Sequence, residues 1–264
     1  MKIHFFGMTD VGKKREKNED SLLVNGNIGL FMVADGMGGH LGGEFASRIA
    51  VKTVEETIRQ TLEDPEATIS TDVIFDRGDP GEVLKYAIRT ASQRIFEEAS
   101  RNSNLRGMGT TAVSLLVREN KGYIAHVGDS RAYLVRKSGI QQLTADHSLV
   151  AEQLRAGFIT KEELKHHKYK NIITRSVGFQ NDVEIDLLVR DLEVGDHFLL
   201  CSDGLTNLVE DIDLHKLVTK NQPKEACQKL IELANKKGGD DNVTVVIAII
   251  ADPEGDRGDY LGEH

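Results

Sequence analysis

Four short segments place an aspartate beside glycine at the end of an apolar run, a pattern that could bind a cation. They are residues 31–36 (FMVADG), 125–130 (AHVGDS), 199–204 (LLCSDG) and, in mirror image before the apolar run from Val243, 238–242 (GGDDN). If these strand ends converge, several carboxylates share a site from which water is partly excluded, and a positive charge must neutralise them. A hard divalent cation, which prefers oxygen ligands, is the simplest candidate.

Other interpretations of these segments are weaker. A single Asp-Gly pair is commonly an ordinary turn, but four such places favour a shared site. Glycine after Asp35 and Asp203 permits a sharp turn, so that a backbone carbonyl can join the ligands. No cluster of His or Cys has zinc-like spacing. The dinucleotide fingerprint GxGxxG fails at Leu41, and no GK[ST] motif follows.

A charged segment near the start, residues 9–20, offers a guanidinium at Arg15 and carboxylates at Glu19 and Asp20. Such runs are commonly solvated surface loops. The planar fork of an arginine also suits two phosphate oxygens at once, so the segment is a candidate anion-binding element.

Strands and helices must hold these residues in place. Apolar runs and turn signals predict strands over residues 22–24, 29–34, 112–117, 123–127, 132–135, 140–143, 183–189, 197–201 and 243–250. Helical spacing predicts helices over 46–58, 83–99, 214–218 and 223–236, the second capped by Asp79 with Pro80 in its first turn. A capping-box pattern, Thr160 to Glu163, predicts a further short helix. Because hairpins dominate, we expect an α+β fold: one domain, an antiparallel β-sandwich with helices packed outside it.

The composition excludes several kinds of partner. The 264 residues include 33 Lys+Arg and 42 Asp+Glu, a formal net charge of −9 that argues against nucleic acid and against a membrane surface. Cys201 and Cys227 form no CxxC pair and have apolar neighbours, so we expect two reduced, buried thiols. The N-terminus has no signal-peptide pattern, and no apolar run approaches the ~20 residues of a membrane helix. We therefore expect a soluble, cytoplasmic protein.

Together the motifs resemble the metal-dependent PPM family of serine/threonine protein phosphatases, the type-2C enzymes, in its compact bacterial form. The matching segments occur in family order, at residues 15–20 (REKNED), 33–40 (VADGMGGH), 109–111 (GTT), 126–131 (HVGDSR), 144–148 (TADHS), 173–178 (ITRSVG), 200–205 (LCSDGL) and 239–242 (GDDN). The resemblance implies two antiparallel sheets between helix pairs (α-β-β-α). It further implies a phosphatase domain over 1–251 and a flap over about 144–180. Residues 252–264 contain three glycines and few apolar residues, so we expect a flexible C-terminal tail there.

The resemblance also implies the metal ligands. Asp35 would bridge two Mn²⁺ or Mg²⁺ ions, and the carbonyl of Gly36 would bind one of them. Asp203 and Asp241 would hold the other ion; Asp241 is preferred to its neighbour because the family's ligand directly precedes asparagine. Asp129, with Asp203, would form a weaker third position, so two or three ions are expected.

The remaining implied roles concern the surroundings of the metal pair and the substrate. Asp20 would lie beside the metal pair, and Glu19 would reach it through water. Arg15 would hold the substrate phosphate, and His40 would act as the general acid that protonates the leaving oxygen. A hydroxide bridging the two ions would attack the phosphorus of phosphoserine or phosphothreonine.

Two residues bear on variations of this scheme. Asn207 stands where animal members often have an aspartate, which puts tight binding of a third ion in doubt. Asn207 and Leu233 also stand six residues after the two cysteines, so the CxxxxxR motif of cysteine phosphatases is absent.

Two other functions deserve comparison with a phosphatase. A non-catalytic metal-binding regulatory module of the same fold should have lost a metal-holding carboxylate, yet Asp35, Asp203 and Asp241 are all present. A structural Ca²⁺ domain would hold its ion without turnover, but the EF-hand spacing DxDxDG is absent. For the phosphatase, the resemblance implies phosphoprotein substrates and a serine/threonine kinase among the partners. Nothing in the sequence demands more than a monomer.

Overall fold

The structure is a computed structural model that describes residues 1–38, 41–63, 76, 78–160, 162–163 and 167–252. His40 and residues 253–264 of the expected tail lie outside this set. The strands are β1 (Lys2–Asp10), β2 (Asp20–Asn25), β3 (Leu30–Met37), β4 (Gly109–Thr110), β5 (Ala112–Arg118), β6 (Lys121–Val127), β7 (Arg131–Arg136), β8 (Gly139–Gln142), β9 (Asp186–Asp191), β10 (His197–Cys201) and β11 (Val243–Ala251). The helices are α1 (Gly42–Glu63), α2 (Pro80–Arg101), the 3₁₀ turn η1 (Ser103–Leu105), α3 (Leu149–Arg155), α5 (Asp203–Thr206), α6 (Asp211–Lys220) and α7 (Pro223–Lys236).

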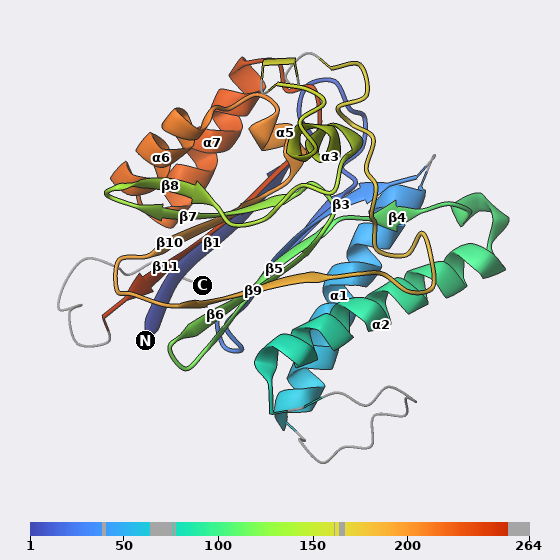
Figure 1. The fold of residues 1–264 in the computed structure, drawn as a ribbon. Coiled ribbons are helices and arrows are strands. Elements are labelled where there is room, and N and C mark those ends of the chain that lie inside the picture. Colours follow the sequence, from blue (N-terminus) through green and yellow to red (C-terminus); the bar gives the residue numbers. More distant parts are fainter. Residues whose placement is uncertain (39–40, 64–75, 77, 161, 164–166, 253–264) are drawn as a thin grey trace.

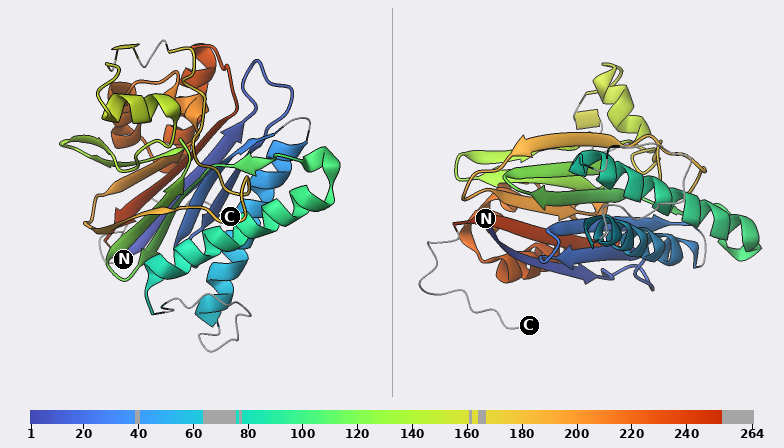
Figure 2. Two further views of the ribbon diagram at one scale, coloured as in Figure 1. Left: turned by 45° about the vertical axis from the view of Figure 1, so that its right-hand side comes forward. Right: turned by 90° about the horizontal axis from the view of Figure 1, so that it is seen from below.

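Two antiparallel sheets form the centre of the molecule. One has the strand order β1-β11-β10-β7-β8, and the other has the order β2-β3-β5-β6-β9, with the short β4 paired to β3. Helices α6 and α7 cover the outer face of the first sheet, and α1 and α2 cover the second (Figure 1; Figure 2, right). The expected α+β sandwich between helix pairs is confirmed.

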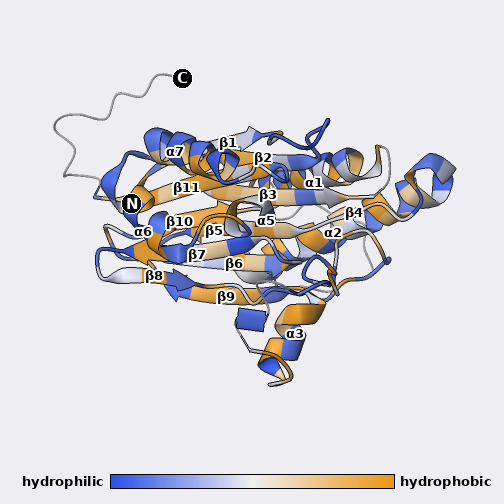
Figure 3. Cartoon of the chain, turned by 90° about the horizontal axis from the view of Figure 1, so that it is seen from above, coloured by the Kyte–Doolittle hydropathy of each residue, from blue (hydrophilic) through white to orange (hydrophobic). Residues whose placement is uncertain are grey.

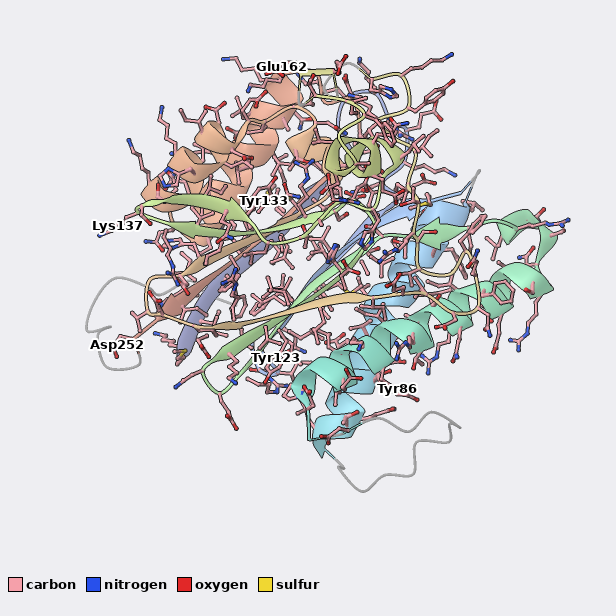
Figure 4. All side chains as sticks on the ribbon, in the orientation of Figure 1. Tyr86, Tyr123, Tyr133, Lys137, Glu162 and Asp252 are labelled. Carbon is pink, nitrogen blue, oxygen red and sulfur yellow. The ribbon has the colours of Figure 1, made fainter. Side chains whose placement is uncertain are left out.

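Alternating side chains of the strands fill three apolar layers. In β3, Leu30, Met32 and Ala34 face α1 and α2, whereas Phe31 and Val33 face the other sheet. Strands β10 and β11 alternate in the same way between the inter-sheet layer and α6 and α7. Strands buried on both faces are continuously apolar in sequence, which is visible as orange along β3, β10 and β11 in Figure 3. Tyr123 on β6 and Tyr133 on β7 mark the two sheets in Figure 4.

The helix boundaries follow local chemistry. Asp79 caps α2, since its Oδ1 accepts a hydrogen bond of 2.8 Å from the Gly81 N–H, and Pro80 occupies the first turn. Helix α7 likewise begins at Pro223. In the flap, Glu163 accepts a hydrogen bond from the backbone N–H of Thr160 (2.7 Å) and donates its own N–H to the Thr160 hydroxyl (3.3 Å). The expected capping box is therefore present.

Several elements differ from the sequence-based expectation, and the short elements η1, β4 and α5 were not predicted. Strand β1 was not predicted, although it pairs with β11 along its whole length, from Lys2↔Ala251 to Asp10↔Val243. Strand β9 begins at Asp186 rather than at residue 183. Helix α3, capped by Ser148, lies within the flap and was also not predicted. Among the described residues, no helix is both long and apolar enough to cross a bilayer.

Candidate metal centre

The strand topology brings the predicted aspartates to one end of the sandwich. Asp20 opens β2 and is the register partner of Asp35 in β3. Asp129 follows β6, which runs in the same direction as β3 because both are antiparallel to β5. In the other sheet, Asp203 follows β10 and Asp241 precedes β11, and these antiparallel strands place the two residues at the same end. The predicted convergence of strand ends is therefore present.

These residues surround a cleft of about 630 Å³. It is lined by Arg15, Glu16, Lys17, Glu19, Asp35, Gly36, Met37, Gly38, Asp129, Asn171, Ile173, Asp203, Asp241 and Asn242. Asn171 and Ile173 belong to the predicted flap, so the flap forms one wall; its helix α3 lies at the same end of the molecule as α5 (Figure 1). Asp20 is buried beside the cleft rather than lining it.

The carboxylates strongly perturb one another. Desolvation, followed by the charges of Asp20, Asp203, Asp129 and Asp241, raises the pKa of Asp35 well above its ordinary value. Burial raises the pKa of Asp20 to about 7, and burial with the nearby Asp203 raises that of Asp129 to about 8. These directions are those of acids confined together without a neutralising cation.

The donor set fits a hard divalent cation. Asp20 Oδ1 and Asp129 Oδ1 are buried and have no hydrogen-bond partner within the described part of the chain. An unsatisfied buried carboxylate oxygen is costly, and a cation with oxygen ligands would remove that cost. All the candidate ligands offer oxygen, which suits Mn²⁺ or Mg²⁺ better than zinc.

Hydroxyl groups that the sequence analysis did not assign support Asp20. The hydroxyls of Ser202 and Thr244 donate to its Oδ2 at 2.8 and 2.6 Å. Oδ2 is therefore fixed, while Oδ1 has no hydrogen-bond partner among the residues that the structure describes. A signal existed for Thr244, which is the polar residue that interrupts the apolar run of β11.

The GTT segment positions Asp35 through its backbone. The Asp35 N–H donates to the Thr111 hydroxyl (2.9 Å), and the Asp35 carbonyl accepts from the Thr110 hydroxyl and the Thr111 N–H, both at 2.8 Å. Thr110 and Thr111 are fully buried. The sequence contained this motif, but only the fold reveals that it fixes the strand that carries Asp35.

The two glycines after aspartates do not make the sharp turns that we expected. Gly36 lies inside β3 and Gly204 inside α5, and neither has a positive φ. Each allows a close approach instead, because a Cβ on Gly36 would collide with the carbonyl of Gly43, and one on Gly204 with that of Asn242. The carbonyl of Gly36 as a metal ligand remains a prediction.

Arg15 lies at the cleft and already contacts one of the candidate ligands. Its Nη2 donates to Asp241 Oδ2 at 2.7 Å, and about half of its side chain is exposed. Glu19 is half-buried in the cleft, and desolvation raises its pKa although Arg15 opposes the shift. The structure thus brings Arg15 and Glu19 to the aspartates, as the resemblance implied.

Asn242, directly before the first residue of β11, binds the segment that carries Arg15 and Glu19. Its Oδ1 accepts from the Glu19 N–H at 2.8 Å, and its Nδ2 donates to the carbonyls of Val11 and Lys17, both at 2.9 Å. The amide is buried and uses both of its ends. In the sequence, Asn242 served only to identify Asp241 as the candidate ligand, and its role in holding the Arg15 segment was not predicted.

Two further residues named from the sequence are His40 and Asn207. His40 lies outside the described residues, although the nearby Gly38 lines the cleft. Asn207 donates to Asp203 Oδ2 at 2.9 Å, so it orients one of the two residues of the expected third metal position.

A second group of potential ligands lies under the flap. Nitrogen or oxygen atoms of His126, His147 and Asp186 lie within 4.8 Å of one another, which sequence spacing could not reveal. However, the Gly128 N–H donates to His147 Nδ1 at 3.1 Å, and Arg175 Nη1 lies 3.4 Å from His147 Nε2 and 2.8 Å from Asp186 Oδ1. The guanidinium supplies the positive charge here, so this group joins the flap to β6 and β9 rather than forming a metal site.

The α-β-β-α sandwich and its carboxylate-lined cleft define a class of metal-dependent phosphatases. The family model described as "Protein phosphatase 2C" matches residues 12–244, and the chain belongs to this family. The chain is 38% identical over 249 residues to "Serine/threonine phosphatase stp" of Listeria monocytogenes, covering 93% of this chain and 95% of the relative.

Solved structures agree with this assignment. The phosphatase Stp1 of Staphylococcus aureus superposes with a TM-score of 0.84 at 33% identity, over 96% of each chain. The catalytic domain of the phosphatase PstP, solved in complex with two manganese ions, has a TM-score of 0.82 at 34% identity over 95% of this chain and 99% of that one. The predicted family and fold are confirmed; the roles of single residues remain predictions.

Proposed function

We propose that the protein hydrolyses phosphoserine and phosphothreonine in proteins, using two Mn²⁺ or Mg²⁺ ions held by the aspartate cluster. The observation that carries this proposal is the group of aspartates from both sheets in and beside one cleft. Asp129 in the cleft and Asp20 beside it each have a buried oxygen without a hydrogen-bond partner among the described residues. The phosphatases named among the relatives, and the two manganese ions of PstP, support it.

Asp35, Asp203 and Asp241, with the Gly36 carbonyl, would hold the two cations. Asp20 and Glu19 would act beside them, and Asp129 with Asp203 would form a third position. Bound divalent cations supply positive charge at the phosphate and lower the pKa of water towards ~7.

Arg15 would orient the phosphate. A guanidinium has five N–H donors, and the contact with Asp241 is made through Nη2, which leaves donors for phosphate oxygens. The ion pair holds the guanidinium at the cleft before the substrate arrives, which reduces the entropy lost on binding. His40 remains the candidate for protonating the leaving oxygen.

The proposal is tested by assays of p-nitrophenyl phosphate and of phosphopeptides. Turnover should stop with EDTA and return with Mn²⁺. Persistent inactivity in millimolar Mn²⁺ would overturn the proposal and favour the non-catalytic module. Turnover with Mn²⁺ but none with Ca²⁺ would also exclude a structural calcium domain.

Adjacent aspartates provide a matched pair of variants. Asp241→Asn should abolish turnover, whereas Asp240→Asn should retain it, because Asp240 is exposed and pairs with Lys14 at 2.6 Å. Equal activity of the two variants would contradict the ligand assignment.

We also propose a serine/threonine kinase as the source of the substrates, a monomeric and cytoplasmic enzyme, and a phosphatase domain over residues 1–251. The residues proposed to bind the metal ions and the phosphate all belong to this chain, so the proposed chemistry needs no second copy. Light scattering tests the monomer, and phosphoproteomics of a deletion strain tests the substrates.

A further inference from the structure

Two hollows continue the metal cleft along the surface. The first, of about 410 Å³, shares Met37 and Ile173 with the cleft. The second, of about 680 Å³, shares Gly107 and Phe179 with the first and reaches the C-terminal turns of α2. The two hollows therefore form one path that begins at the cleft, and we call it the flanking path.

Paired backbone segments support the part of the flanking path that adjoins the cleft. Met37 in β3 pairs with Gly109 in β4. The next residue, Thr110, exchanges backbone hydrogen bonds of 3.0 and 2.8 Å with Val177 of the flap. Three extended segments thus lie side by side, and Figure 1 shows the flap segment passing close to β4 and α2.

Phe179 projects into the path from a fixed backbone. Its side chain is 62% exposed, yet the buried Ser92 of α2 holds both of its neighbours. The Ser92 hydroxyl accepts from the Gly178 N–H at 2.9 Å and donates to the Gln180 carbonyl at 3.1 Å. Gly178 has φ +90°, and a Cβ there would collide with Ile95. An aromatic ring on a backbone that is already ordered can bind a partner at low entropic cost.

The far end of the path is open and is lined by two arginines. Gly107 has φ +79°, and a Cβ there would meet no atom within 4 Å. Arg101 and Arg106 are the charged side chains that line the second hollow in the described structure. Arg101 is paired with Glu97 and Glu98 on its own helix, which leaves Arg106 as the better partner for an acidic group.

We propose that the flanking path binds the stretch of a protein substrate adjacent to the phosphorylated residue. An apolar side chain of that stretch would pack on Phe179, and an acidic one would reach Arg106. The proposal rests on the phosphatase function proposed above. A polypeptide is favoured because it must leave the cleft along the surface. The flanking path adjoins the cleft, carries the ring of Phe179 on a fixed backbone and ends at the guanidinium of Arg106.

The test uses the full chain loaded with Mn²⁺ and three phosphothreonine peptides of equal length. One carries leucine and glutamate on the N-terminal side of the phosphothreonine, one carries them on the C-terminal side, and one has serine and glycine throughout. We expect the wild type to prefer one leucine-containing peptide over the plain peptide by about tenfold in kcat/KM. Phe179→Ala should abolish this preference, and Phe179→Leu should keep most of it.

Ile212→Ala is the matched control, since Ile212 is a 77% exposed apolar residue on α6, in the other helix pair. It should leave the preference unchanged. The proposal is overturned if the wild type shows no preference, or if Phe179→Ala retains it. Hydrolysis of p-nitrophenyl phosphate by the wild type separates this result from failure of the phosphatase function, because that ester occupies only the cleft.

Discussion

Asp35 lies among four other aspartates, so its charge is unfavourable in the metal-free protein. Asp35→Asn should therefore have two opposite effects. Metal-dependent turnover should fall at least about a hundredfold if Asp35 is a ligand of the metal ions, as proposed. The metal-free protein should become more stable by about 1 kcal/mol, a rise in Tm of roughly 2–4 °C. Phosphatase assays with Mn²⁺ and thermal denaturation in EDTA measure the two effects. A lower Tm in EDTA would contradict the assignment of Asp35 to a repulsive cluster.

Arg15 should act mainly on substrate binding. Arg15→Ala should raise KM for phosphopeptides about 10–100-fold, which corresponds to the loss of one charge-assisted hydrogen bond. The change in kcat should be smaller if Arg15 makes the same contact in the ground state and in the transition state. Arg15→Lys should recover only part of the loss, because lysine lacks the planar fork. The control is Lys14→Ala, since Lys14 is exposed and pairs with Asp240. A fall in kcat alone would place the contact in the transition state instead.

Single acids were predictable from the sequence, whereas their supports were not. Asp35, Asp129 and Asp203 follow apolar runs, which is a local signal. Ser202 and Thr244 act on Asp20 from positions 182 and 224 residues away. Thr244 stands out as the polar residue in an apolar run, but nothing local indicates that either hydroxyl binds Asp20.

Among the elements, the start of β11 holds residues 11–19 in place through Asn242, which directly precedes this strand. Asn242→Ala removes three hydrogen bonds and leaves a buried N–H and carbonyls without partners. We expect a loss of about 2–3 kcal/mol in the free energy of unfolding. The apparent affinity for Mn²⁺ should also fall, since Glu19 and Asp20 lose their tie to Asp241.

Chemical denaturation and calorimetric titration with Mn²⁺ measure these two effects. Asn235→Ala is a useful comparison, because Asn235 bonds Asp10 at 3.0 Å on the same segment but lines no part of the cleft. If both variants weakened Mn²⁺ binding equally, Asn242 would have no specific role in the site.

The predictability of each element depended on its packing. Helix α7 begins and ends as the sequence predicted, because Pro223 and Gly238-Gly239 are local signals. Strand β1 was missed because most of its side chains are only half-buried, so its apolar alternation is weak. The alternation before β9 was real but misleading: Val183 and Ile185 pack on the core under α1 and α2 without joining the strand.

At the scale of the molecule, the stability of the metal-free protein should depend on pH with a definite sign. The folded-state pKa values of Asp20 and Asp129, about 7 and about 8, exceed the ordinary value of 3.8. The folded state therefore binds more protons than the unfolded state between these limits. This contribution to stability is fully present below about pH 4 and is lost as the pH rises through 7–8.

Thermal denaturation in EDTA should thus show Tm falling by about 5 °C between pH 5 and 8. Saturating Mn²⁺ should reduce or reverse the fall, because it binds the ionised carboxylates and stabilises the fold by about 2.7 kcal/mol at a hundred times its Kd. A metal-free Tm that rises over this range would contradict the mutual repulsion of the aspartates.

Most of the sandwich architecture could be predicted from hairpins and apolar strands, because these are local patterns. The sequence alone could not show that the aspartates lie close together, because their proximity depends on which strands pair. The His126, His147 and Asp186 group and the flanking path depend entirely on contacts between distant segments, and no local pattern indicates them.

The pairing of β1 with β11 also sets the order of events when the chain is synthesised. Residues 2–10 are synthesised long before their strand partner at 243–251. The carboxylate of Asp20 must likewise wait for Asp241. Long-range pairings of this kind form late, after most of the chain is available. We therefore expect a nascent chain to gain phosphatase activity only after residues 241–251 have been synthesised and can pair with β1.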